Sequence, residues 1–155
     1  MDLSKPVQIG KNIVVGPAPT QEMLEKLADR GCKAVVNLSK KGELNQPMNP
    51  EDEGCAVEKL GMSYIHLPVT LSTVKDDHVN QFCDLMDEAQ RPIYVHCRIG
   101  QRAIPFSLIY HAIKRKLSPE KLFKKADSLG VAWDAPFIRN LVAKHVKKAA
   151  ETAAA

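Results

Sequence analysis

The chain has 155 residues, of which 45% are apolar and 26% charged, and its formal net charge is +4 at pH 7. This balance excludes a disordered chain, and no run approaches the roughly 18 apolar residues that a membrane-spanning helix needs. The length suits one domain with a hydrophobic core, expected at residues 1–150, and the alanine-rich end, residues 151–155, is expected to fray.

The N-terminal residues lack the apolar segment of a secretory signal, and the four cysteines are widely scattered. We therefore expect a cytoplasmic protein without a disulfide framework. Cys32, Cys55 and Cys83 lie in or beside helical patterns and are expected to be small buried side chains. The histidines show no metal-ligand spacing, so we expect neither a metal nor another cofactor.

Charge is distributed unevenly along the chain. Residues 1–97 contain 10 Lys and Arg against 14 Asp and Glu, a net of −4, whereas residues 98–155 contain 12 against 4, a net of +8. A basic segment can bind nucleic acid or an acidic membrane. Here the lysines fall on exposed faces of amphipathic helices and aromatic residues make up only 5% of the chain, so neither partner is expected.

The chain begins with turn and strand signals. Residues 7–9 and 12–15 flank Gly10-Lys11 and predict a hairpin. Thr20 then predicts the cap of a helix, because the apolar residues that follow it have helical spacing. Residues 34–38 are apolar apart from one asparagine and predict a buried strand.

A long polar segment separates this strand from the next helix. Pro50 is expected to open that helix, with Asn49 as its cap and the acidic residues Glu51, Asp52 and Glu53 at the positive end of the helix dipole. Further elements are predicted as strands at 64–67 and 93–96 and as helices at 75–89, 101–116, 119–128 and 135–148, the last two capped by Ser118 and Asp134.

Strands that alternate with helices predict an α/β fold, with a central, mostly parallel sheet flanked by helices. Parallel strands place their carboxyl ends at one edge of the sheet, where ligands bind. The segments that leave this edge are 39–49, 69–74 and 97–101, so we expect the functional site to lie among them.

The last of these segments carries the residues with the clearest chemistry. It runs from a strand through a turn into a helix, and the backbone N–H groups of such a turn favour an anion and would stabilise a thiolate at Cys97. Arg102 adds a planar cationic fork that suits an oxyanion, and Gly100 permits the turn. The pattern predicts attack by the Cys97 thiolate on an electrophile that carries oxyanion charge, with His96 supporting the loop. The oxyanion would be bound by Arg98, Ile99, Gly100, Gln101 and Arg102.

These residues resemble the phosphatase-like domain of the beta-lactamase-hydrolase-like proteins, a bacterial branch related to dual-specificity protein phosphatases. The resemblance extends from about Val7 to Gly130 and implies a dual-specificity-phosphatase-like fold, with Cys97 as the nucleophile and Arg102 as the oxyanion ligand. The stretches that carry it are Gly16-Pro17-Ala18-Pro19, Val35-Val36-Asn37-Leu38 with Lys41-Gly42-Glu43, the run from Gly61 to Val69, and the run from Val95 to Arg102.

Three features depart from the ordinary tyrosine phosphatases. Only four residues separate the cysteine from the arginine, a spacing that rhodanese sulfurtransferases share, and Ala103 stands where those phosphatases usually have a hydroxyl residue. The carboxylates nearest to the loop that holds their aspartate general acid are Asp76 and Asp77, which also suit the first turn of a helix. Glu43 could select a substrate, accept a hydrogen bond or be a solvated loop acid.

The sequence favours a cysteine-dependent phosphatase-like hydrolase that acts on phosphoric monoesters or another oxyanion substrate and forms a phosphocysteine at Cys97. A rhodanese-type sulfurtransferase that carries a persulfide on Cys97 is the alternative, favoured by the short loop, Ala103 and the lack of a clear acid. A phospho-ligand binding module without catalysis is a third interpretation, against which the cysteine argues because a binder needs no thiolate.

Overall fold

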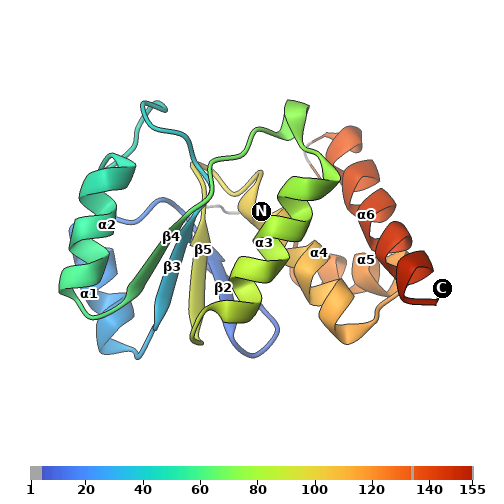
Figure 1. Ribbon diagram of the computed structural model, residues 1–155, viewed down its shortest axis with the longest axis horizontal. Helices are drawn as coiled ribbons and strands as arrows, with labels where there is room; N and C mark the ends of the chain where they lie inside the picture. The colour runs from blue at the N-terminus through green and yellow to red at the C-terminus, as the bar shows by residue number, and fades with distance from the viewer. Residues whose placement is uncertain (1–4, 134, 155) are drawn as a thin grey trace.

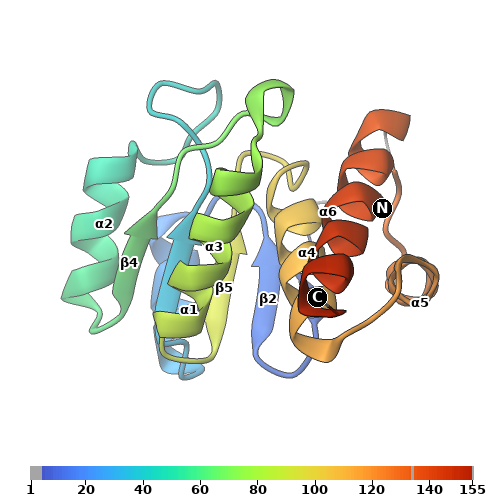
Figure 2. The same ribbon diagram turned by 45° about the vertical axis from the view of Figure 1, so that its right-hand side comes forward.

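The computed structural model describes residues 5–133 and 135–154, which form a five-stranded sheet with helices on both faces (Figures 1 and 2). The strand order is β1-β2-β5-β3-β4; β1 pairs antiparallel with β2, and all other neighbours are parallel. This confirms the predicted α/β fold with a mostly parallel sheet. The strands are β1 (Val7–Ile9), β2 (Ile13–Gly16), β3 (Ala34–Asn37), β4 (Ser63–His66) and β5 (Ile93–His96).

The helices form a thin layer on one face of the sheet and a thicker one on the other. Helices α1 (Gln21–Asp29) and α2 (Pro50–Lys59) cover the first face. The second face is covered by α3 (Asp76–Glu88) and α4 (Ala103–Arg115), with α5 (Pro119–Ser128) and α6 (Pro136–Ala154) beyond α4. In the described part of the chain, no helix combines the length and the apolar character needed to cross a membrane.

Helix α4, which follows the loop at residues 97–102, lies almost entirely in the hydrophobic core. Every residue from Ala103 to Ala112 is buried, because α4 lies between the sheet and the two outer helices. A helix that is apolar on all sides needs such a position. The loop that precedes α4 is therefore anchored at both ends by buried elements, β5 before it and α4 after it.

Three helix caps match the sequence. Met23 N donates to Thr20 Oγ1 over 3.2 Å, Asp52 N donates to Asn49 Oδ1 over 2.8 Å, and Lys121 N donates to Ser118 Oγ over 3.3 Å. Each cap satisfies an N–H group that has no partner within its own helix. The caps thus fix where α1, α2 and α5 begin, at the residues that the sequence predicts.

Some expectations differ from the structure. A short 3₁₀ helix, η1 (Leu71–Thr73), lies where only a loop was predicted. Helix α6 continues to Ala154, beyond its predicted end at residue 148, and the expectation that residues 151–155 fray stays a prediction. The expected cap at Asp134 lies outside the described residues.

The expectation for one cysteine is wrong. Cys32 is buried and Cys83 is half-buried, but Cys55 is exposed. It lies on the outer side of α2, whereas Glu53, Gly54 and Val57 form the buried side of that helix. The helical spacing places Cys55 away from the sheet.

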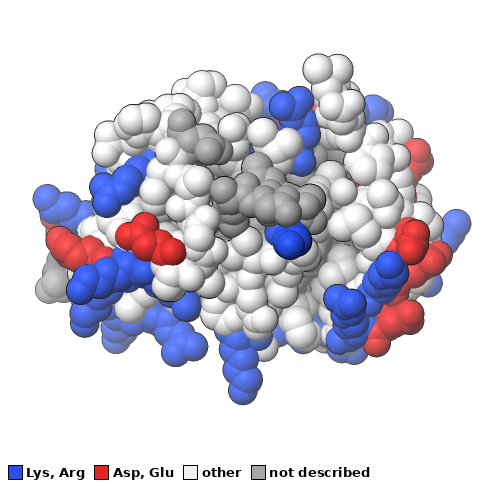
Figure 3. Space-filling view, turned by 180° about the vertical axis from the view of Figure 1, so that it is seen from behind, with Lys and Arg blue, Asp and Glu red and all other residues white. Residues whose placement is uncertain are grey.

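Charged side chains are spread over the molecule. On the face opposite to the view of Figure 1, Lys and Arg lie mostly toward the edges, with Asp and Glu beside them (Figure 3). The cytoplasmic location, and the expectation that neither nucleic acid nor membrane is a partner, stay predictions.

Gly54 lets α2 approach β4 closely. A Cβ atom at this position would lie 2.9 Å from Cδ2 of Tyr64, closer than real side chains pack. Ordinarily an alanine in a helix is favoured over glycine by about 1 kcal/mol. Here the contact with the ring of Tyr64 should outweigh that gain.

We therefore expect Gly54→Ala to lower the free energy of unfolding, because overpacking of this kind costs about 1–3 kcal/mol. Urea unfolding followed by circular dichroism measures the change. Cys55→Ala, at the exposed neighbouring position, is the control and should unfold like the wild type. A Gly54→Ala protein more stable than the wild type would show that α2 has room to move.

Candidate active site

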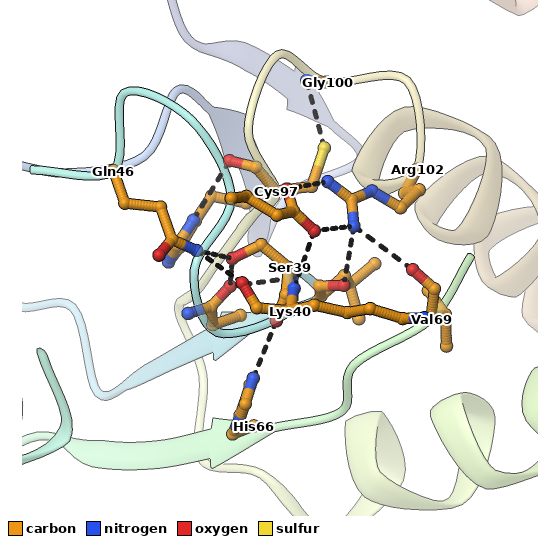
Figure 4. A network of polar contacts seen from close by, with 12 residues as sticks. Ser39, Lys40, Gln46, His66, Val69, Cys97, Gly100 and Arg102 are labelled. Carbon is orange, nitrogen blue, oxygen red and sulfur yellow. Dashed lines mark hydrogen bonds and ion pairs between the residues drawn. The ribbon is translucent and has the colours of Figure 1, made fainter. Parts of the chain in front are cut away.

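Cys97 lies directly after β5, in the middle of the sheet, and its side chain is fully buried. The loop then turns at Gly100, whose φ of +87° lies in the left-handed region that glycine tolerates best. This turn aims the N–H of Gly100 at Cys97 Sγ, 3.0 Å away (Figure 4). This hydrogen bond fixes the sulfur atom against the turn of the loop.

Arg102 at the end of this loop makes a bidentate ion pair with Glu43. Nη1 donates to Oε1 over 2.7 Å and Nη2 to Oε2 over 2.6 Å, and the side chains are 14% and 20% exposed. Nη1 also donates to the carbonyl of Val69 over 3.1 Å (Figure 4). The hydrogen bonds from Arg102 lower the pKa of Glu43 below its ordinary 4.5, and the carboxylate in turn raises the pKa of Arg102. Both groups are therefore charged at neutral pH.

This pairing keeps one edge of the guanidinium available. Glu43 takes one N–H from each of the two Nη atoms, and the carbonyl of Val69 faces the second one of Nη1. Nε and the remaining hydrogen of Nη2 donate to no oxygen atom of the described residues, and Cys97 interacts with the guanidinium. These two N–H groups form a second fork that matches two oxygens of a phosphate. Glu43 thus orients Arg102 without using the edge that an oxyanion needs.

A cleft of about 610 Å³ opens at the carboxyl edge of the sheet, above the loop that follows β5. It brings together the three segments that the sequence placed at this edge, and the N-terminal end of α6 joins them. Glu43 is the only carboxylate among its described lining residues. The lining consists of Gly42, Glu43, Leu44, Thr70, Leu71, Ser72, Cys97, Arg98, Ile99, Gln101, Arg102 and Phe137.

Apolar side chains surround the charged centre of this cleft. Leu44, Ile99 and Phe137 are 73%, 38% and 55% exposed, and they are the most exposed large apolar side chains of the described residues. All three line the same cleft. Exposed apolar groups that gather in one place mark a binding surface more often than chance.

Asp76 and Asp77 do not line this cleft. The carboxylate of Asp76 makes an ion pair with Lys148 and lies 3.2 Å from Nδ1 of His145, both on α6, and the hydrogen bond from Lys148 lowers the pKa of Asp76. The side chain of Asp77 is exposed. The first turn of α3 therefore directs Asp76 toward α6, and the structure does not bring either aspartate together with Cys97.

The sequence analysis missed one residue of this region. Glu53 was assigned only to the helix dipole, but it is 2% exposed and its Oε2 lies 2.7 Å from Nε2 of His96. The spacing held a signal, because Glu53 precedes the buried Val57 by four residues and so shares its face of α2. The sequence analysis expected His96 to support the loop. In the structure, Nδ1 of His96 lies 3.3 Å from the carbonyl oxygen of Cys97.

Residues 5–126 match the PTP-NADK family, described as a DSP-PTPase phosphatase fused to NAD+ kinase. The chain belongs to this family. A beta-lactamase hydrolase-like protein of Agrobacterium fabrum is 27% identical over 114 residues, which are 73% of this chain and 26% of that protein. The match confirms the predicted family resemblance, and the chain spans about a quarter of the length of this relative.

Solved structures of phosphatases share the fold. A candidate phosphatase of Shewanella putrefaciens has a TM-score of 0.77 and 22% identity, covering 95% of this chain and 94% of its own. PTPMT1 in complex with PI(5)P has a TM-score of 0.74 and 17% identity, covering 91% and 94%. TpbA of P. aeruginosa, in complex with pTyr, has a TM-score of 0.75 and 13% identity, covering 97% and 91%. These likenesses confirm the dual-specificity-phosphatase-like fold.

The Glu43–Arg102 pair should make stability depend on pH. Because folding lowers the pKa of Glu43, its contribution is present above about pH 4.5 and is lost as the pH falls through the lower pKa of the folded state. We expect Glu43→Gln to lower the free energy of unfolding by about 1 kcal/mol at neutral pH and to match the wild type in strong acid.

Urea unfolding between neutral pH and about pH 3 measures this difference. Glu58→Gln, at an exposed position of α2, controls for the loss of one negative charge. A stability difference that stays constant over this pH range would show that the pair contributes nothing through its charge.

Proposed function

We propose that the protein is a cysteine-dependent phosphatase that hydrolyses phosphoric monoesters through a phosphocysteine at Cys97. One observation carries this proposal: Cys97, whose Sγ accepts the N–H of Gly100, lines the same cleft as Arg102. The thiolate attacks phosphorus, a sulfur–phosphorus bond forms, and the bond from phosphorus to the ester oxygen breaks. Water then attacks the phosphocysteine and releases inorganic phosphate and the thiolate.

The backbone of residues 98–102 and the guanidinium of Arg102 bind the phosphoryl oxygens in this mechanism. Fixed donors that point at developing negative charge stabilise a transition state without having to reorganise. Glu43 contributes by holding Arg102 in place over 2.6 and 2.7 Å. Its role is thus to orient the arginine rather than to transfer a proton.

The cleft supports an organic phosphate as the substrate. Its volume of about 610 Å³ is that of a site for a drug-sized ligand, much larger than a phosphate group alone. Leu44, Ile99 and Phe137 provide apolar contacts beside the anion site. Among the proteins that share this fold, one was solved with pTyr and one with PI(5)P, which are organic phosphates.

A sulfurtransferase is the second candidate. The four-residue spacing from Cys97 to Arg102 and the buried Ala103, which offers no hydroxyl group, favour it. Transfer of a sulfane sulfur expels sulfite or a thiolate, so it needs no acid, and the cleft holds no described carboxylate besides Glu43. Membership of a phosphatase family favours hydrolysis instead. A phospho-ligand binding module, the third interpretation, would need the oxyanion site but not the thiol.

Parallel assays separate these three functions. We expect the wild type to release phosphate from an aryl phosphate and to form no thiocyanate from thiosulfate and cyanide. Cys97→Ser should lose the hydrolysis, because a hydroxyl group at this position is far less ionised than a thiol. Formation of thiocyanate without release of phosphate would establish the sulfurtransferase. A protein that binds phosphate but forms neither product would be the binding module.

The role of the two aspartates is open to a separate test. We propose that Asp76 and Asp77 do not protonate the leaving group, so Asp76→Ala and Asp77→Ala should keep wild-type kcat on both an aryl and an alkyl phosphate. An acid matters most for a poor leaving group. A strong loss on the alkyl phosphate with a weak loss on the aryl phosphate would identify the substituted aspartate as the acid.

A further inference from the structure

A buried acid–imidazole pair lies behind the loop that carries Cys97. Glu53 comes from the first turn of α2 and His96 from the end of β5, and their side chains are 3% and 1% exposed. Glu53 Oε2 and His96 Nε2 are 2.7 Å apart. Burial of a carboxylate or an imidazolium is costly unless each is paired and hydrogen-bonded, so the contacts of this pair show how it is stabilised.

Both ring nitrogens of His96 face oxygen atoms. Nε2 faces the carboxylate of Glu53, and Nδ1 lies 3.3 Å from the backbone carbonyl of Cys97. A backbone carbonyl can only accept a hydrogen bond, so the contact at Nδ1 requires an N–H there. Nε2 of His96 and the carboxyl group of Glu53 then share one proton across 2.7 Å.

The groups around this pair are neutral phenols. The ring of Tyr94 on β5 lies 6.1 Å from that of His96, and Tyr64 on β4 accepts a hydrogen bond from the amide of Asn37 over 3.1 Å. Burial above all, and then the charge of Glu53, raise the pKa of both tyrosines, so both keep their protons. The close approach of α2 to β4 at Gly54, the residue after Glu53, brings the carboxylate to this place.

The contact with the Cys97 carbonyl sets the direction of the next peptide group. In a trans peptide, the carbonyl of one residue and the N–H of the next point to opposite sides. Successive side chains of a strand also point to opposite faces of the sheet, so His96 and Cys97 face different sides. A Cys97 carbonyl held on the His96 side therefore turns the N–H of Arg98 toward the side of the thiol.

We propose that Glu53 is a positioning residue: it orients the ring of His96, whose Nδ1–H fixes the Cys97 carbonyl and thereby directs the Arg98 N–H at the oxyanion of the substrate. This inference rests on the proposed function, because that function supplies the oxyanion. Glu53 itself touches no substrate. It acts on the reaction through two other residues of the chain.

Glu53→Gln tests the proposal, since glutamine keeps the size but removes the carboxyl group that shares a proton with Nε2 of His96. Glu51→Gln, on the exposed side of the same helical turn, is the matched control. With an aryl phosphate we expect the kcat of Glu53→Gln to fall by up to about 100-fold, with a smaller change in KM, and Glu51→Gln to match the wild type. A purely structural role would change stability but not the kcat of the folded protein, so a folded Glu53→Gln enzyme with wild-type kcat overturns the proposal.

A second measurement depends neither on turnover nor on the folding of a variant. In the ¹⁵N NMR spectrum of the wild type, assigned through the backbone, Nδ1 of His96 should have the shift of a ring nitrogen that carries a proton. An Nδ1 without a proton overturns the proposal. Hydrolysis that survives in Cys97→Ser would instead overturn the proposed function, while the spectrum of His96 would still decide its protonation.

Discussion

The guanidinium of Arg102 joins segments that are far apart in the sequence. It contacts Glu43 on the segment after β3 and the carbonyl of Val69 after β4, and it closes the loop that begins at Cys97. Those segments leave the same edge of the sheet because β3, β4 and β5 are parallel. One charged side chain thus connects the three segments that form the cleft. Its contacts with Glu43 and Val69 hold it in place without a bound substrate.

Two acid–base pairs flank the loop that carries Cys97. Glu43 orients Arg102 on the side of the cleft, and Glu53 contacts His96 on the side of α2. Each carboxylate faces a cationic or basic partner from the segment 96–102, so the negative charge near Cys97 is largely neutralised. In the proposed hydrolysis, a thiolate and a phosphate, both negative, could approach each other only where such compensation exists. The buried positions of β5 and α4 add rigidity at the two ends of the loop.

Local signals and strand–helix alternation were enough to predict most of the fold. The caps at Thr20, Asn49 and Ser118 set helix starts, and the parallel sheet followed from the alternation. The loop at Cys97 was visible because its residues are adjacent in the sequence. The pairing of Glu53 with His96 and that of Glu43 with Arg102 were not visible in this way, since these residues are 43 and 59 positions apart. Side-chain pairs of that kind depend on how α2 and the 39–49 segment pack, which no local pattern encodes.

For Asp76, the position in the sequence suggested a place in the site that the structure does not confirm. Its sequence position, just after the loop that follows β4, suggests proximity to the site, but α3 turns its carboxylate toward Lys148 and His145 on α6. The described cleft is then left with Glu43 as its carboxylate, already bound to Arg102. For the proposed hydrolysis, such a cleft would favour leaving groups that depart without a proton, such as an aryl oxide, over those that need one, such as a simple alkoxide. The apolar side chains of Leu44, Ile99 and Phe137 suit the first kind better, since an aryl group is both the better leaving group and the more apolar one.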